Sequence, residues 1–128
     1  MRVFKNAWFV RFARKQRISE RALLDAIARV EQGQIDADLG GGVIKQRIAR
    51  QGQGKSGGFR SIILYRQGDH AFFVYAFAKS DRDNIDAHEE AQFKNAAAHL
   101  FSLTRHQLNE LIETGQLTEI PHEQAIPQ

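Results

Sequence analysis

The sequence predicts an α+β fold: an antiparallel β-sheet of about four strands, mixed at one edge, with an N-terminal helical hairpin and C-terminal helices packed on it. The chain has 128 residues, which suffice for one modest domain but not for two. Apolar residues recur at helical spacing near both ends and form strand-like runs in the middle. Strands that are grouped between helices favour an α+β class.

The first third of the chain predicts one strand and two helices. Residues 1–5 (MRVFK) form a short strand, and Asn6 can cap a helix that runs to about residue 17. Ser19 can cap a second helix, whose apolar side chains lie on one face and which Gly33 ends. We therefore expect a helical hairpin over a sheet.

The middle of the chain predicts three strands. They span residues 43–50, 59–66 and 70–79. A turn over residues 36–42 (DADLGGG) precedes them, a glycine-rich loop over residues 51–58 (QGQGKSGG) separates the first two, and a tight turn over residues 67–69 separates the last two. The third strand is apolar on both faces, so we expect it in the centre of the sheet, antiparallel to its predecessor.

Two capping patterns predict the last helices. Asp86 and Glu89 form a D-x-x-E pattern, and Thr104 and Gln107 repeat it as T-x-x-Q before a helix that Gly115 ends. These patterns satisfy the free N–H groups of a first helical turn, so each marks a helix start.

The remainder of the chain predicts a short edge strand and a tail. Residues 117–120 can form the strand, so we expect one domain over residues 1–120 and a loose tail over 121–128. No apolar run approaches the ~20 residues that span a bilayer, and the chain has no cysteine. We expect a cytoplasmic protein without membrane association.

Charge is distributed unevenly along the chain. Residues 1–82 hold 16 basic and 7 acidic residues, whereas residues 83–128 hold 2 basic and 8 acidic ones. Between residues 39 and 68 the charged side chains are all basic: Lys45, Arg47, Arg50, Lys55, Arg60 and Arg66. Such a stretch attracts polyanions, although it can also be a solvated basic face.

Several enzyme classes lack their motifs here. The five histidines show no metal-ligand spacing, and no G-x-S-x-G is present. The glycine-rich loop lacks the first glycine of a P-loop, and a strand rather than a helix follows it. The residues thus give no support to acyl transfer or metal-dependent hydrolysis, and we expect no cofactor and no metal.

Four cations could contact phosphate. Lys55 lies in the glycine-rich loop, where a backbone can approach phosphate closely, although the loop can also be a simple connection. Arg60 lies in an apolar strand and could clamp phosphate with its planar guanidinium, or form a salt bridge at the sheet edge. Lys79 and Arg82 follow the last long strand, in a turn whose acids can also pair with them.

Three blocks of sequence resemble the RelE/HigB-like toxin family, in particular its branch of RelE-like translational repressors. The blocks are residues 40–47 (GGGVIKQR), 52–60 (GQGKSGGFR) and 72–85 (FFVYAFAKSDRDNI). The resemblance extends over residues 1–120. It implies a RelE/ParE-like fold, with helices packed on one face of a compact sheet and a basic face left open.

The resemblance also implies a function and a set of site residues. Members of this family are toxins of type II toxin–antitoxin systems that cut mRNA, usually on the ribosome and without a metal. Arg60, Lys79 and Arg82 match the family's catalytic cations, while Lys45, Arg47, Lys55 and Arg66 are expected to bind RNA. Ser80 stands where the best-known pattern has an arginine, and Ile85 or Asp86 stands near the place of its tyrosine.

The expected partners are the ribosome, mRNA and a cognate antitoxin. The antitoxin is expected to be a helix-turn-helix protein, and the toxin should reach operator DNA only through it. Two alternatives stay open: a toxin of the same fold that inhibits DNA gyrase by binding, and a nucleic-acid-binding relative without catalysis.

Overall fold

The computed structural model describes residues 1–50 and 57–121. The strands in these ranges are β1 (Arg2–Asn6), β2 (Ala37–Gly40), β3 (Val43–Ile48), β4 (Phe59–Arg66), β5 (His70–Ala78) and β6 (Leu117–Glu119). The helices are α1 (Ala7–Gln16), α2 (Glu20–Glu31), α3 (Ala87–Phe101) and α4 (Arg105–Glu113). Most of the predicted glycine-rich loop and all of the predicted tail except Pro121 lie outside the described residues.

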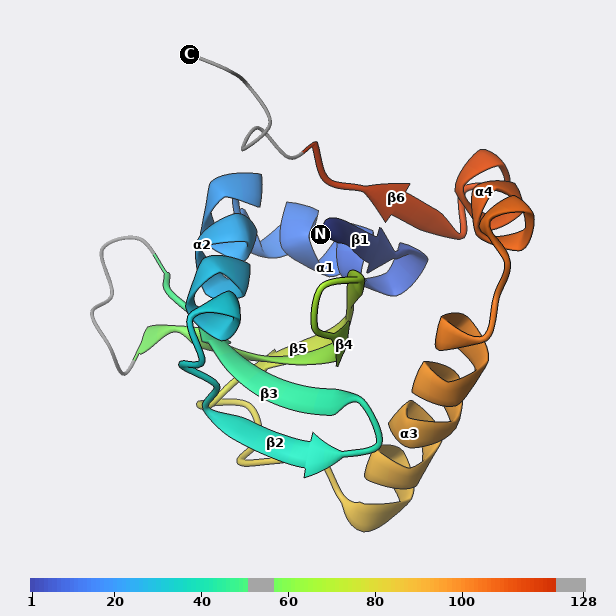
Figure 1. Ribbon diagram of the computed structural model, residues 1–128. Coiled ribbons are helices and arrows are strands. Elements are labelled where there is room, and N and C mark those ends of the chain that lie inside the picture. The colour runs from blue at the N-terminus through green and yellow to red at the C-terminus, as the bar shows by residue number, and fades with distance from the viewer. Residues whose placement is uncertain (51–56, 122–128) are drawn as a thin grey trace.

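The α+β class is confirmed, with more strands than predicted. The six strands of the described chain form one sheet in the order β2-β3-β4-β5-β1-β6 (Figure 1). Neighbouring strands are antiparallel, except that β1 runs parallel to β5. The sheet is therefore mixed, and β5 occupies its interior as predicted.

The prediction of a turn over residues 36–42 is wrong for its first part. Residues 37–40 form β2, which pairs with β3 through a hairpin whose last register pair is Gly40 with Val43. Gly41 and Gly42 both have positive φ (62° and 81°), as a two-residue hairpin of type I′ requires. The glycines thus turn the chain, and the residues before them form an edge strand despite their polar character.

Helices cover both faces of the sheet, whereas the resemblance implied one. One buried cluster joins α1 and α2 to Ile44, Ile63 and Phe73. The other joins α3 and α4 to Val43 and Leu64, and α2 and α3 accordingly lie on opposite sides of β3 (Figure 1). Consecutive residues of β4 are buried because each face of the strand has its own core, which explains the continuous apolar run.

The helix starts follow the predicted caps. The side chains of Asn6 and Ser19 accept hydrogen bonds from the backbone N–H groups of Phe9 and Ala22. Both predicted capping boxes, at α3 and α4, are formed with reciprocal bonds. None of the described helices is both long and apolar enough to cross a membrane.

Candidate functional site

Cationic side chains gather on one face at the end of three neighbouring strands. Arg47 of β3 lies opposite Arg60 of β4, which in turn lies opposite Phe77 of β5. Lys45, two residues before Arg47, belongs to the same face because side chains alternate along a strand. This is also the face that α3 covers farther along β3 and β4, where Val43 and Leu64 are fully buried. Lys45, Arg47 and Arg60 remain partly exposed beyond it.

Two arginines in direct cross-strand register cost stability, about 0.2–1 kcal/mol for a pair of like charges. Asp36 offsets part of this cost from the residue before β2. One of its carboxylate oxygens accepts a hydrogen bond from the Arg47 backbone N–H at 2.6 Å and lies 3.9 Å from a guanidinium nitrogen of Arg60. Sequence reasoning assigned Asp36 to a turn and missed this contact, because an i to i+24 pairing leaves no local pattern.

A depression with a volume of about 200 Å³ lies over this end of the sheet. Its described lining consists of Asp36, Ala37, Lys45, Arg60, Phe77, Lys79, Asp83 and Asn84. Phe77 is buried, so its ring forms an apolar floor between the cations. Three cations and two carboxylates around an apolar floor can accept an anionic group with an attached planar ring, which is the chemistry of a nucleotide.

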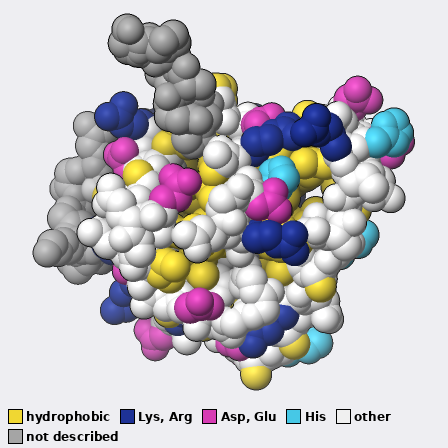
Figure 2. Space-filling model, viewed as in Figure 1, with side chains coloured by type: hydrophobic (Ala, Val, Ile, Leu, Met, Phe, Trp, Pro, Cys, Tyr) yellow, Lys and Arg dark blue, Asp and Glu magenta, His cyan; other side chains and the backbone are white. Residues whose placement is uncertain are grey.

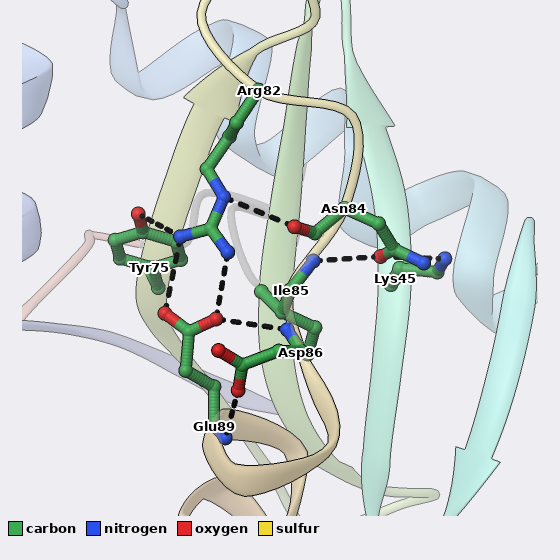
Figure 3. A network of polar contacts seen from close by, with 7 residues as sticks. All are labelled: Lys45, Tyr75, Arg82, Asn84, Ile85, Asp86 and Glu89. Atoms are coloured by element: carbon green, nitrogen blue, oxygen red, sulfur yellow. Dashed lines mark hydrogen bonds and ion pairs between the residues drawn. The ribbon is translucent and has the colours of Figure 1, made fainter.

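The turn after β5 is fixed by a network around Arg82 (Figure 3). Its guanidinium donates two hydrogen bonds to the Glu89 carboxylate, at 2.7 and 3.1 Å, and a third to the Tyr75 hydroxyl at 3.1 Å. Its Nε donates to the backbone carbonyl of Asn84 at 3.0 Å. Arg82 thus ties β5 to the first turn of α3, and most of its donors are engaged within the fold.

The same network reaches the depression through Asn84. The Asn84 side-chain oxygen accepts hydrogen bonds from the Lys45 ammonium at 3.2 Å and from the Ile85 backbone N–H at 2.8 Å (Figure 3). Glu89 in turn accepts from the Asp86 backbone N–H and completes the capping box of α3. The turn that carries Lys79 and Asn84 is therefore held in one place from both sides.

The Arg82–Glu89 pair makes stability depend on pH. Hydrogen bonds from Arg82, and then from the Asp86 backbone, hold the pKa of Glu89 below its ordinary value, and the Glu89 carboxylate raises the pKa of Arg82. A carboxyl group whose pKa is depressed by folding stabilises the folded state above its unfolded pKa, and this contribution is lost as the pH falls through the folded value.

We expect Glu89→Gln to lower the melting temperature at pH 7, with an effect that shrinks as the pH falls below about 4 and is lost once the pH lies below the lowered pKa of Glu89 in the folded state. Thermal unfolding of both proteins across this range, with exposed Glu113→Gln as the control, measures the difference. A deficit in Glu89→Gln that stays constant down to low pH would show that the lost interaction is not the ionised pair.

The other predicted site residues lie apart from this cluster. Arg66 is at the opposite end of β4, over the Phe101 ring and 3.5 Å from the Asp69 carboxylate. It lies six positions along the strand from Arg60, which corresponds to roughly 20 Å. Lys55 lies outside the described residues.

The basic side chains form no continuous patch on the face shown in Figure 2. On the face shown in Figure 2, Lys and Arg side chains are interspersed with Asp and Glu. The residues that line each depression therefore decide where an anion binds. Near Arg60 two cations lie close together, because Arg47 stands directly opposite it across the β3–β4 pair. Within residues 1–50 and 57–121, no three His, Asp or Glu side chains come together in an arrangement that could hold a metal ion.

Comparison with models of protein families gives a match. The family model described as RelE toxin of RelE / RelB toxin-antitoxin system matches residues 1–120. A search of curated proteins gives no significant match. The matched range contains every described helix and strand, together with the depression and its lining.

Proposed function

The chain belongs to the RelE toxin family, since the family model spans residues 1–120 of its 128, and from this membership we propose that it is a metal-independent endonuclease that cuts mRNA. The observation that carries the proposal is the cluster of Lys45, Arg60 and Lys79 around the depression. Phosphodiester cleavage needs cations fixed in advance where charge develops on phosphate. The cluster offers two such cations on the sheet and a third, Lys79, in the turn after β5.

The proposed reaction uses the RNA's own 2′-hydroxyl. Its oxygen attacks the adjacent phosphorus, the bond to the 5′-oxygen of the next nucleotide breaks, and a 2′,3′-cyclic phosphate forms. One proton leaves the 2′-hydroxyl and one reaches the departing 5′-oxygen. Arg60 is proposed to stabilise the phosphate oxygens in the transition state through its planar donors, and Lys45 and Lys79 to add charge on either side.

Arg47 and Arg82 have different proposed roles. Arg47 neighbours Arg60 across the strands and is proposed to bind an adjacent phosphate of the RNA. Arg82 was predicted as catalytic from the sequence, and its contacts with Glu89 and Tyr75 favour a positioning role for the turn that holds Lys79. Lys55 stays a predicted RNA contact, whereas the position of Arg66 at the far end of β4 supports no contact with the same phosphate.

The proposed partners follow from family membership. RelE toxins pair with RelB-type antitoxins, so a cognate antitoxin is proposed for this chain, of the helix-turn-helix type predicted from the sequence. Ribosome dependence and a cytoplasmic site of action are proposed on the same ground. An acidic segment of the antitoxin would be attracted to the cations near Arg60 and would block RNA there.

We expect induced expression of the chain to stop growth and to shorten transcripts within minutes. The measurement is growth after induction, together with primer extension on an abundant mRNA to locate cut sites. Cuts in transcripts that are being translated, but not in the same transcripts when initiation is blocked, would support ribosome dependence.

The alternatives give other results in the same cells. Plasmid DNA that loses negative supercoiling while transcripts stay intact would indicate gyrase inhibition and contradict the proposal. Growth arrest with intact transcripts and unchanged supercoiling would indicate RNA binding without cleavage, which also contradicts it.

A further inference from the structure

A second basic feature lies at the corner between α1 and α2, beside the ends of β3 and β4. It is a groove with a volume of about 520 Å³. Among the described residues, its lining has a single acid, Asp25, and five arginines: Arg17, Arg21, Arg29, Arg47 and Arg50. Arg21 pairs with Asp25 at 3.3 Å in an exposed ion pair, which leaves the groove with a strong positive excess.

Arg17 has an unusual backbone for its residue type. It has φ 57° and is the one non-glycine residue with positive φ in the described chain. Its N–H bonds the Arg14 carbonyl while the N–H of Ile18 bonds the Ala13 carbonyl, the pattern in which glycine normally ends a helix. A glycine would fit this position without steric cost, so helix termination does not require the arginine. Arg17 also lines the groove.

The floor of the groove pairs an arginine with an aromatic ring. The Arg50 guanidinium lies over the Phe59 ring, 5.3 Å from its centre. A flat guanidinium held against a ring offers a stacking surface for a nucleobase together with charge for its phosphate.

Arg47 joins the groove to the site described above. It lines the groove, and it also stands opposite Arg60 across the β3–β4 pair. The Arg29 side chain donates to the Arg47 backbone carbonyl at 2.6 Å, which fixes this strand end against α2. A polyanion bound at Arg60, on the face that α3 covers, reaches the groove on the α1–α2 side by passing the ends of β3 and β4 at Arg47.

We propose that this groove binds the phosphate backbone of the RNA strand beyond the cleaved bond, as a second subsite of the same enzyme. The inference rests on the proposed function and adds to it the path of the substrate. Five arginines with no lysine favour phosphates, which the guanidinium fork binds through two donors. An acidic protein segment would need the same charge but not the neighbouring cation Arg60 or the stacking surface of the Arg50 guanidinium.

The test uses an RNA that the protein binds but cannot cut. A single-stranded oligonucleotide of about 12 nucleotides reaches both subsites, one of about 4 reaches one, and methylation of every 2′-oxygen removes the nucleophile. Fluorescence anisotropy across a range of salt concentrations gives the affinity and its salt dependence. The groove variant is Arg17→Gly with Arg50→Ala, and the control is Arg11→Ala with Arg14→Ala, which removes equal charge from exposed positions of α1 outside the groove.

We expect the groove variant to bind the longer RNA at least tenfold more weakly at physiological salt, since each phosphate contact in a single strand is worth roughly fourfold there. The slope of log affinity against log salt should fall by roughly 1.4, or about 0.7 for each contact. The control variant and the shorter RNA should show little change. The melting temperature of Arg17→Gly should not fall, because glycine suits the left-handed position.

Other outcomes separate the two proposals. Equal affinities of the groove and control variants for the longer RNA would overturn the groove proposal. So would a groove variant that binds this RNA as the wild type does and loses only its affinity for the antitoxin, since the groove would then bind protein. A wild type that shows the expected groove-dependent binding but never cuts unmethylated mRNA would support the groove and refute the endonuclease.

Discussion

Arg60→Ala is expected to reduce mRNA cleavage by roughly 100- to 1000-fold and to abolish growth arrest on induction. This is the typical effect of removing one preorganised donor from a transition state in which charge develops on oxygen. Arg60 is partly exposed, and its ion pair with Asp36 at 3.9 Å is a surface contact worth about 0–1 kcal/mol, so the fold should remain intact. Single-turnover cleavage on programmed ribosomes and circular dichroism measure the two effects.

Two further variants test whether a loss of cleavage is specific to the guanidinium of Arg60. Arg60→Lys keeps the charge but loses the planar fork, so its activity should lie between the wild type and Arg60→Ala. Arg105→Ala removes an exposed cation at the start of α4, far from the depression, and should cut RNA as the wild type does. If Arg60→Ala retains full activity while Arg105→Ala does not, the site is misplaced.

Arg60 also shows what the sequence could predict about the site. An arginine within an apolar strand is conspicuous because its burial needs a partner or solvent, and this local conflict made Arg60 a candidate site residue without a structure. The caps of α1, α2, α3 and α4 were predicted for the same reason, since each depends on residues within four positions of one another. Interactions between residues that are close in the sequence can therefore be predicted from it.

Contacts between segments that are far apart in the sequence could not be predicted from it. Strand β2 was predicted as a turn because its polar residues gain their partners only when β3 pairs with them. Asp36 and Arg60 are 24 positions apart, and the register of β3 with β4 brings them together. Arg66 illustrates the converse, because its place in the same basic stretch suggested a shared site that the direction of β4 does not allow.

The contacts of Arg82 could be predicted only in part from the sequence, and the structure supplies the rest. Its position after β5 predicted a cation near the site, and the D-x-x-E pattern predicted the cap of α3. That Glu89 would serve the cap and Arg82 together follows only from the way in which the turn folds back onto α3. A cation that the resemblance placed in catalysis is thus engaged in holding the turn after β5 against α3.

Gly58→Ala is expected to destabilise the fold and to impair cleavage together, which ties the end of the glycine-rich segment to the site. A Cβ at Gly58 would overlap the backbone carbonyl oxygen of Ile48 and lie 3.2 Å from the Arg47 guanidinium. The Ile48 oxygen belongs to β3 and cannot rotate away, so the two strand ends must separate. Overpacking of this kind costs about 1–3 kcal/mol.

The separation should also displace Arg47, which lies between the proposed cleavage site and the arginine groove, so RNA affinity should fall with stability. Gly68→Ala is the control, because its added Cβ meets open space in the turn between β4 and β5 and only its positive φ (75°) carries a cost. Chemical denaturation gives both stabilities, and cleavage is measured well below each melting point. If Gly58→Ala is as stable as the wild type and cuts RNA at the same rate, the end of β3 is not rigid. A preorganised pair of Arg47 and Arg60 then cannot be the basis of the activity.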